Sequence, residues 1–228
     1  MLQAVAFDCD GVLADNQSSW QSIHEHFGTE NNETLDLFLD GKISEEEFVE
    51  EDIRKWREVQ PEIHRDDIMR CFGGLKLMEG AREVVEELQS RGVYIAIISS
   101  GVDLCVGAIA SMLNVDDWVA NGFEWDEDGW LLGGLPTRVL SHEKGLMVEK
   151  LVRINGFSPS GLVSVGDSGT DISMMIEGSS FIGFNPIRSK SRRAFEKAGV
   201  PIVPGEDLRG IWPLLFSGES GPKLQRSQ

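Results

Sequence analysis

A long apolar segment is absent from this sequence. No run approaches the roughly 18 apolar residues that a membrane-spanning helix requires. The first apolar run meets Asp8 too early to form the apolar core of a signal peptide. Together these two absences predict a cytoplasmic protein with no membrane partner.

Cysteine and positive charge are also scarce. The three cysteines, Cys9, Cys71 and Cys105, are widely spaced and match neither a disulfide framework nor a zinc site. The 21 lysines and arginines stand against 38 aspartates and glutamates, which gives a formal net charge of -17. Such a field repels polyanions, so nucleic acid is excluded as a partner. A phosphate ester would be repelled too, unless a metal ion or a buried lysine makes its site positive.

Short β-rich runs alternate with amphipathic helices from residue 78 onward. This alternation predicts an α/β fold, a doubly wound parallel sheet with helices on both faces. Strands are expected at residues 4–7, 93–98, 161–165, 181–184 and 200–203, and a hairpin within 118–133. Helices are expected to begin near residues 81, 102, 144, 172, 188 and 207.

A helical segment interrupts this pattern between residues 17 and 73. Ser44 and Glu47 have the spacing of a capping box, and Pro61 suits the first turn of a further helix. We interpret residues 17–73 as a helical-bundle cap inserted into a core of residues 1–16 and 74–216. Residues 217–228 have no apolar pattern and are expected to be disordered. Nothing in the sequence indicates the oligomeric state.

Polar residues follow the ends of the predicted strands. Asp8 and Asp10 follow the first strand, Ser99 and Ser100 the second, and Asp167 a later one. Two acidic residues at the end of a single strand, taken alone, are more often solvated surface residues than part of a functional site. The carboxyl ends of parallel strands meet at one edge of the sheet, however, so all these groups are expected to share one site.

Such a site suits phosphoryl transfer. Asp8 is the candidate nucleophile that would form an aspartyl-phosphate. Asp10 is the candidate general acid toward the leaving alkoxide and then the general base for water. Asp167 and Asp171 supply hard oxygen ligands, which suit Mg²⁺. The predicted phosphate-binding residues are Gly11, Ser99, Ser100 and Lys144.

These motifs resemble the haloacid dehalogenase superfamily of Mg²⁺-dependent phosphatases, and within it most closely the phosphoserine phosphatases. The resemblance covers nearly the whole chain and implies a Rossmann-like core with a helical cap. It implies that Asp8, Asp167 and the backbone carbonyl of Asp10 bind Mg²⁺. It also implies a small phosphorylated metabolite as the substrate.

Two positions depart from the phosphoserine phosphatase pattern. Gln17 stands where a glutamate binds the substrate amine in that group. The cap arginine that binds the substrate carboxylate aligns on or near an acid, and Arg54 substitutes for it only if the helix register differs. Gln17 and Arg54 are therefore the candidate specificity residues, with phosphoserine or another small ester such as a sugar phosphate as the substrate.

Other functions remain open on sequence grounds. A phosphotransferase or phosphomutase would use the same aspartyl-phosphate with an acceptor other than water. A receiver-type switch is also phosphorylated on aspartate, but it needs neither Asp10 nor an inserted cap. A member of the superfamily that only binds its ligand is disfavoured, because the Asp8-Asp10 pair, Ser99, Lys144 and Asp167 are all present.

Overall fold

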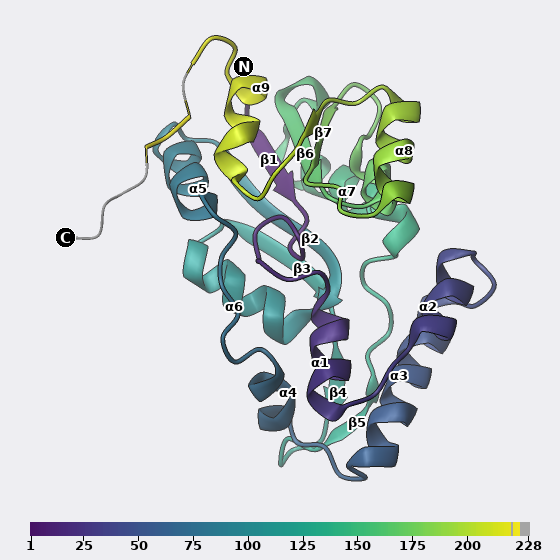
Figure 1. Ribbon diagram of the computed structural model, residues 1–228. Coiled ribbons are helices and arrows are strands. Elements are labelled where there is room, and N and C mark those ends of the chain that lie inside the picture. Colours follow the sequence, from purple (N-terminus) through teal and green to yellow (C-terminus); the bar gives the residue numbers. More distant parts are fainter. Residues whose placement is uncertain (220, 224–228) are drawn as a thin grey trace.

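The computed structural model describes residues 1–219 and 221–223, and its centre is a six-stranded sheet of order β3-β2-β1-β6-β7-β8 (Figure 1). All neighbouring strands are parallel. The strand order reverses at β1, which confirms the predicted doubly wound sheet and marks the point where such sheets bind ligands. The strands are β1 (Ala4–Phe7), β2 (Tyr94–Val102), β3 (Asp117–Asn121), β6 (Leu162–Gly166), β7 (Ser180–Phe184) and β8 (Ile202–Val203).

Separate apolar clusters cover the two faces of the sheet. Alternation along β1 sends Val5 and Phe7 into one cluster, whereas Ala4 and Ala6 join the other. The first face is covered by α5 (Ala81–Ser90), α6 (Asp103–Leu113), η4 (Leu208–Ile211) and α9 (Trp212–Leu215). The second is covered by α7 (Gly145–Asn155), η3 (Gly169–Met174) and α8 (Ser189–Ala198), with the short turns η1 (Ser141–Glu143) and η2 (Pro159–Gly161) nearby in the chain.

The helices α1 (Ser19–Phe27), α2 (Asn32–Leu39), α3 (Glu45–Val59) and α4 (Arg65–Cys71) lie between β1 and α5. The predicted capping box at the start of α3 is present, because Glu47 N donates to Ser44 Oγ and Ser44 N donates to Glu47 Oε2. The prediction for Pro61 is wrong. The helix that follows begins only at Arg65, where the His64 side chain accepts from Asp66 N.

The hairpin β4 (Phe123–Trp125) and β5 (Leu131–Gly134) packs against these helices rather than against the sheet (Figure 1). Phe123 and Leu131 belong to the same apolar cluster as Trp20 of α1 and Trp56 of α3. The predicted boundaries assign residues 74–216, and with them the hairpin, to the core. In the structure the hairpin packs with the cap helices instead.

Two elements differ from the sequence prediction near the carboxyl edge of the sheet. β2 does not end before Ser99 but continues to Val102, with a register shift between Ile98 and Val102. The helix predicted after Asp171 is a short 3₁₀ helix that ends at Met174 and leaves Met175 exposed. Secondary-structure propensities alone predict neither the register shift in β2 nor the short 3₁₀ helix.

Glu219 forms a surface ion pair with Arg91, in which Glu219 Oε2 lies 2.7 Å from Arg91 Nη1. Part of the predicted disordered tail 217–228, namely residue 220 and residues 224–228, lies outside the described residues. Among the residues that the structure describes, no helix combines the length and apolar character needed to cross a membrane.

The cluster around Trp56 predicts a large stability effect. Trp56 is fully buried and contacts the rings of Trp20, Phe27 and Phe123. Trp56→Ala should lower the free energy of unfolding by about 3–5 kcal/mol, because it leaves a cavity among aromatic side chains. Urea unfolding followed by circular dichroism measures this. Trp118→Ala, at a residue 42% exposed on β3, should cost below about 1 kcal/mol. Equal losses would contradict this description of the cluster.

Candidate active site

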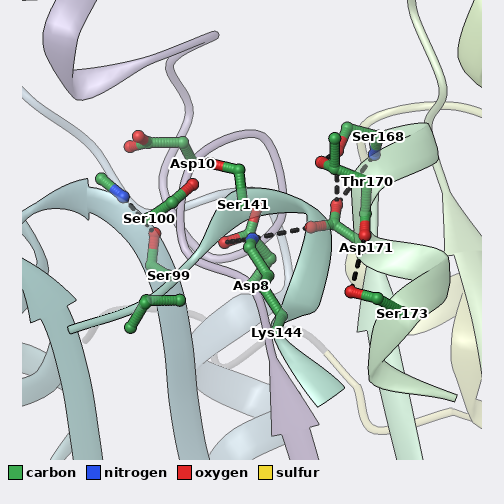
Figure 2. A network of polar contacts seen from close by, with 12 residues as sticks. Asp8, Asp10, Ser99, Ser100, Ser141, Lys144, Ser168, Thr170, Asp171 and Ser173 are labelled. Carbon is green, nitrogen blue, oxygen red and sulfur yellow. Dashed lines mark hydrogen bonds and ion pairs between the residues drawn. The ribbon is translucent and has the colours of Figure 1, made fainter. Parts of the chain in front are cut away.

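Four chain segments bring ionisable groups together at the carboxyl edge of the sheet (Figure 2). Asp8 follows β1, Asp167 follows β6, Asp171 lies in η3 and Lys144 precedes α7. Carboxylate oxygens of Asp8, Asp167 and Asp171 lie within 4.8 Å of one another. The convergence expected from the strand ends is therefore present.

Lys144 lies between two of these carboxylates. Its side chain is 2% exposed, and Nζ lies 2.9 Å from Asp8 Oδ1 and 2.6 Å from Asp171 Oδ1 (Figure 2). Burial alone lowers the pKa of Lys144, but Asp171 and Asp8 outweigh burial and raise it. Lys144 is therefore a fixed ammonium group. The adjacent Gly145 permits this position, since a Cβ there would lie 2.3 Å from the backbone oxygen of Ser173.

Asp171 holds Lys144 from the other side. Its Oδ2 accepts from Ser168 N at 2.9 Å and from Ser168 Oγ at 3.0 Å, while Oδ1 faces the ammonium group. Asp171 is thus both a capping acid of η3 and a partner of Lys144.

The acidic cluster fits a divalent cation. Burial raises the pKa of Asp8 to about 7, with Lys144 opposing the rise and Asp171 adding to it. The pKa of Asp167 is raised well above its usual value, first by burial and then by Asp171 and Asp8. The Lys144 ammonium group, 2.9 Å from Asp8 Oδ1, offsets only part of this clustered negative charge. A divalent cation would keep these carboxylates ionised, and hard oxygen donors suit Mg²⁺.

Asp10 faces the helical cap instead of the acidic cluster. Its Oδ2 accepts from Ser19 N and Ser19 Oγ, each at 2.8 Å, and its Oδ1 accepts from Asn16 Nδ2 at 2.9 Å. In Figure 2 the carboxylate of Asp10 points away from Lys144. The side chain of Asp10 is therefore separate from the candidate metal ligands, as a proton-transferring group requires.

Ser19 is a site residue that the sequence analysis missed. It begins α1, and its Oγ also accepts from Val102 N of β2 at 2.9 Å. Gly101 allows this contact, because a Cβ there would lie 2.7 Å from Ser19 Oγ and 2.8 Å from Asp10 Oδ2. The only sequence signal was the Ser18-Ser19 pair at a helix start, which indicates a cap and not a contact to β2.

The predicted phosphate-binding residues lie around Asp8. Ser99 is buried, and its Oγ accepts from Gly101 N at 3.1 Å. Ser100 lies within β2, and its carbonyl accepts from Trp20 Nε1 at 3.0 Å. Gly11 has φ +73°, and a Cβ there would lie 2.8 Å from Asp167 Oδ2.

A cavity of about 850 Å³ joins this edge to the cap helices. Asp8, Asp10, Lys144 and Asp167 line one end, and Gln17 lines the cap side.

The structure does not place Arg54 in this cavity. Its guanidinium pairs with Glu51 and Glu58 on the exposed face of α3, because the inward face of that helix is occupied by Phe48 and Val49. The prediction for Arg54 is therefore wrong. Glu45, the first residue of the same helix, lines the cavity, and the sequence analysis also missed it.

The close approach at Gly11 gives a testable prediction. Gly11→Ala should raise the Kd for Mg²⁺ by about tenfold or more, because the methyl group displaces Asp167. Isothermal titration measures the affinity. Gly156→Ala is the matched control, since Gly156 has φ +68° and open space around its Cβ position. It should lose only about 1 kcal/mol of stability and bind Mg²⁺ normally. Normal Mg²⁺ binding by Gly11→Ala would contradict the assignment.

The chain matches known proteins along most of its length. It is 29% identical to the phosphoserine phosphatase of Methanocaldococcus jannaschii over 212 residues, which cover 91% of this chain and 94% of that protein. A solved phospho-aspartyl intermediate analogue of phosphoserine phosphatase superposes with a TM-score of 0.75 at 27% identity, covering 94% of this chain and 99% of that one. A substrate-bound phosphoserine phosphatase complex, at 24% identity and a TM-score of 0.76, shares the fold. Residues 2–178 match the model of haloacid dehalogenase-like hydrolases, and the chain belongs to that family.

Proposed function

We propose that this chain hydrolyses a small phosphomonoester in a Mg²⁺-dependent reaction, through an aspartyl-phosphate on Asp8. The observation that carries the proposal is the buried Asp8 carboxylate, 2.9 Å from Lys144 Nζ and open to the cavity. The similar structure with a phospho-aspartyl intermediate analogue supports the same intermediate. The phosphoserine phosphatase relative supports a small phosphorylated metabolite, with phosphoserine as one candidate.

The first half-reaction transfers the phosphoryl group to Asp8. A carboxylate oxygen of Asp8 attacks phosphorus, and the bond from phosphorus to the ester oxygen breaks. Protonated Asp10 donates its proton to the departing alkoxide, which leaves as the alcohol. The contacts from Ser19 and Asn16 fix the orientation of Asp10 for this transfer.

The second half-reaction restores the enzyme. Asp10, now a carboxylate, accepts a proton from water while the water oxygen attacks phosphorus. The acyl-phosphate bond breaks, inorganic phosphate leaves, and Asp8 returns as a free carboxylate. Release of phosphate and alcohol in equal amounts distinguishes this hydrolysis from transfer to an acceptor other than water.

The remaining residues bind and orient the phosphoryl group. Lys144 and Ser99 would contact its oxygens, with Gly11 and Ser100 completing the wall by their backbones. Asp8, Asp167 and Asp171 would hold the Mg²⁺, together with the backbone carbonyl of Asp10 that the family resemblance implies. When bound, the ion offsets the charge of the ester and of the clustered carboxylates.

The nucleophile assignment is tested by Asp8→Asn. Turnover of p-nitrophenyl phosphate should fall by at least about 10³-fold, because an amide does not form the acyl-phosphate. Circular dichroism should show a folded protein, since the amide keeps the shape of the carboxylate. Quenching wild-type enzyme in acid with labelled substrate should trap label on the protein, and Asp8→Asn should trap none. Residual turnover near the wild-type level would exclude Asp8 as the nucleophile.

Two further variants separate proton transfer from metal binding. Asp10→Asn should lower kcat by about 10²-fold or more and leave the Mg²⁺ activation constant unchanged, because its side chain faces Ser19. Asp167→Asn should raise that constant by about tenfold or more, because Asp167 belongs to the acidic cluster. Initial rates over a Mg²⁺ series give both quantities. The assignments are reversed if Asp10→Asn shifts the constant and Asp167→Asn does not.

A further inference from the structure

The cap wall of the cavity differs in charge from the catalytic end. The wall from residues 17–49 includes three glutamates, of which Glu45 is buried and Glu25 and Glu30 are exposed. Between them lie apolar side chains, Trp20, Leu35, Phe38, Leu39, Phe48 and Val49. Among the described residues of this wall, no lysine or arginine lines the cavity.

The cations of the neighbouring cap helix bind elsewhere. Lys55 Nζ donates to the backbone oxygen of Glu30 at 3.0 Å and to Thr34 Oγ1 at 3.2 Å. Arg57 Nη2 donates to the backbone oxygen of Leu131 at 2.6 Å. Arg54 pairs with acids on the exposed face of the helix. None of these three side chains lines the cavity, so they do not offset its carboxylates.

His24 also lines this wall but offers no free donor. Its Nδ1 lies 2.7 Å from Thr29 Oγ1 and accepts from Trp56 Nε1 at 3.2 Å. Its Nε2 lies 3.1 Å from Asp52 Oδ1, and Asp52 is fully buried. Both ring nitrogens therefore face protein groups, and one of these groups is the carboxylate of Asp52.

Glu45 is fixed close to the phosphate end. Its side chain is 8% exposed, Oε2 accepts from Ser141 N at 2.9 Å and Oε1 accepts from Ser141 Oγ at 2.6 Å. Burial raises the pKa of Glu45, while the hydrogen bonds from Ser141 and the charges of His142 and Lys144 lower it. This carboxylate therefore stands at the junction between the phosphate site and the cap wall.

The remaining cations of the cavity lie on the opposite side. Arg188 and Lys190, at the start of α8, are exposed at the mouth. An anionic group held there would be screened by water and would gain little. An anionic group directed toward the cap would face the buried carboxylate of Glu45, where like charges repel more strongly than in open solvent.

We propose that the substrate of this site is a phosphomonoester whose leaving group carries an ammonium group and no carboxylate. The inference rests on the proposed function and narrows it to one substrate class. The carboxylates of the cap wall attract the ammonium group, and the aromatic faces of Trp20, Phe38 and Phe48 accept a cation and its hydrocarbon chain.

Two substrates isolate the effect of the carboxylate. O-Phosphoethanolamine and O-phosphoserine differ by that group alone, and both are assayed with Mg²⁺ beside p-nitrophenyl phosphate. We expect kcat/KM for phosphoethanolamine to exceed that for phosphoserine by about tenfold or more. 2-Hydroxyethyl phosphate, in which a hydroxyl replaces the ammonium group, should fall between them. Equal or faster turnover of phosphoserine would overturn the inference, and a faster rate with 2-hydroxyethyl phosphate would overturn the preference for ammonium.

Glu45→Gln removes one charge of the wall and keeps its shape. The amide can still exchange hydrogen bonds with Ser141, so the preference for phosphoethanolamine over phosphoserine should fall by about threefold or more. Glu50→Gln is the matched control, because Glu50 is exposed on the same helix and does not line the cavity. Its preference should equal that of the wild type. An unchanged preference in Glu45→Gln would contradict the role of the wall.

Two outcomes separate this inference from the proposed function. Hydrolysis of p-nitrophenyl phosphate together with a preference for phosphoserine would overturn the inference and leave the function standing. No hydrolysis of any ester would overturn both. If Arg188→Ala selectively lowers turnover of phosphoserine, the carboxylate binds at the mouth, and the inference is also overturned.

Discussion

The charge imbalance among buried groups at one sheet edge is the constraint on which the site depends. Asp8, Asp167 and Asp171 contribute three carboxylates and Lys144 contributes one ammonium group, so three minus one leaves two net negative charges. Charges with little solvent are costly unless they are paired. A divalent cation balances this excess, which agrees with the raised pKa values of Asp8 and Asp167.

Polar contacts from two cap helices join the cap to the catalytic edge. Ser19 at the start of α1 holds Asp10, and Glu45 at the start of α3 holds Ser141, three residues before Lys144. The position of the cap therefore fixes both the Asp10 carboxylate and the segment that carries the Lys144 ammonium group. Without the cap, Asp10 would lose its two hydrogen bonds from Ser19 and keep the one from Asn16.

The catalytic edge could be predicted from the sequence because parallel strands and polar strand ends are local features with a fixed spatial result. Asp8, Ser99, Lys144 and Asp167 converge as expected, although Asp10 turns toward the cap. What could not be predicted depends on contacts between distant segments. Arg54 follows the buried Ile53 on α3, and its guanidinium pairs with Glu51 and Glu58 on the exposed face of the helix. The hairpin, Ser19 and Glu45 likewise acquire their roles only through packing partners from elsewhere in the chain.

The same distinction separates the chemistry of the site from its specificity. At the catalytic edge, the backbone approaches side chains so closely that Gly11 and Gly145 leave no space for a Cβ. A substitution at either glycine would displace Asp167 or the backbone of Ser173, so this edge tolerates little change. The cap wall is formed instead by side-chain ends on amphipathic helices, which can change charge without changing the fold. The substrate must therefore be inferred from the carboxylates and aromatic rings of that wall, because the phosphate-binding edge carries no information about the leaving group.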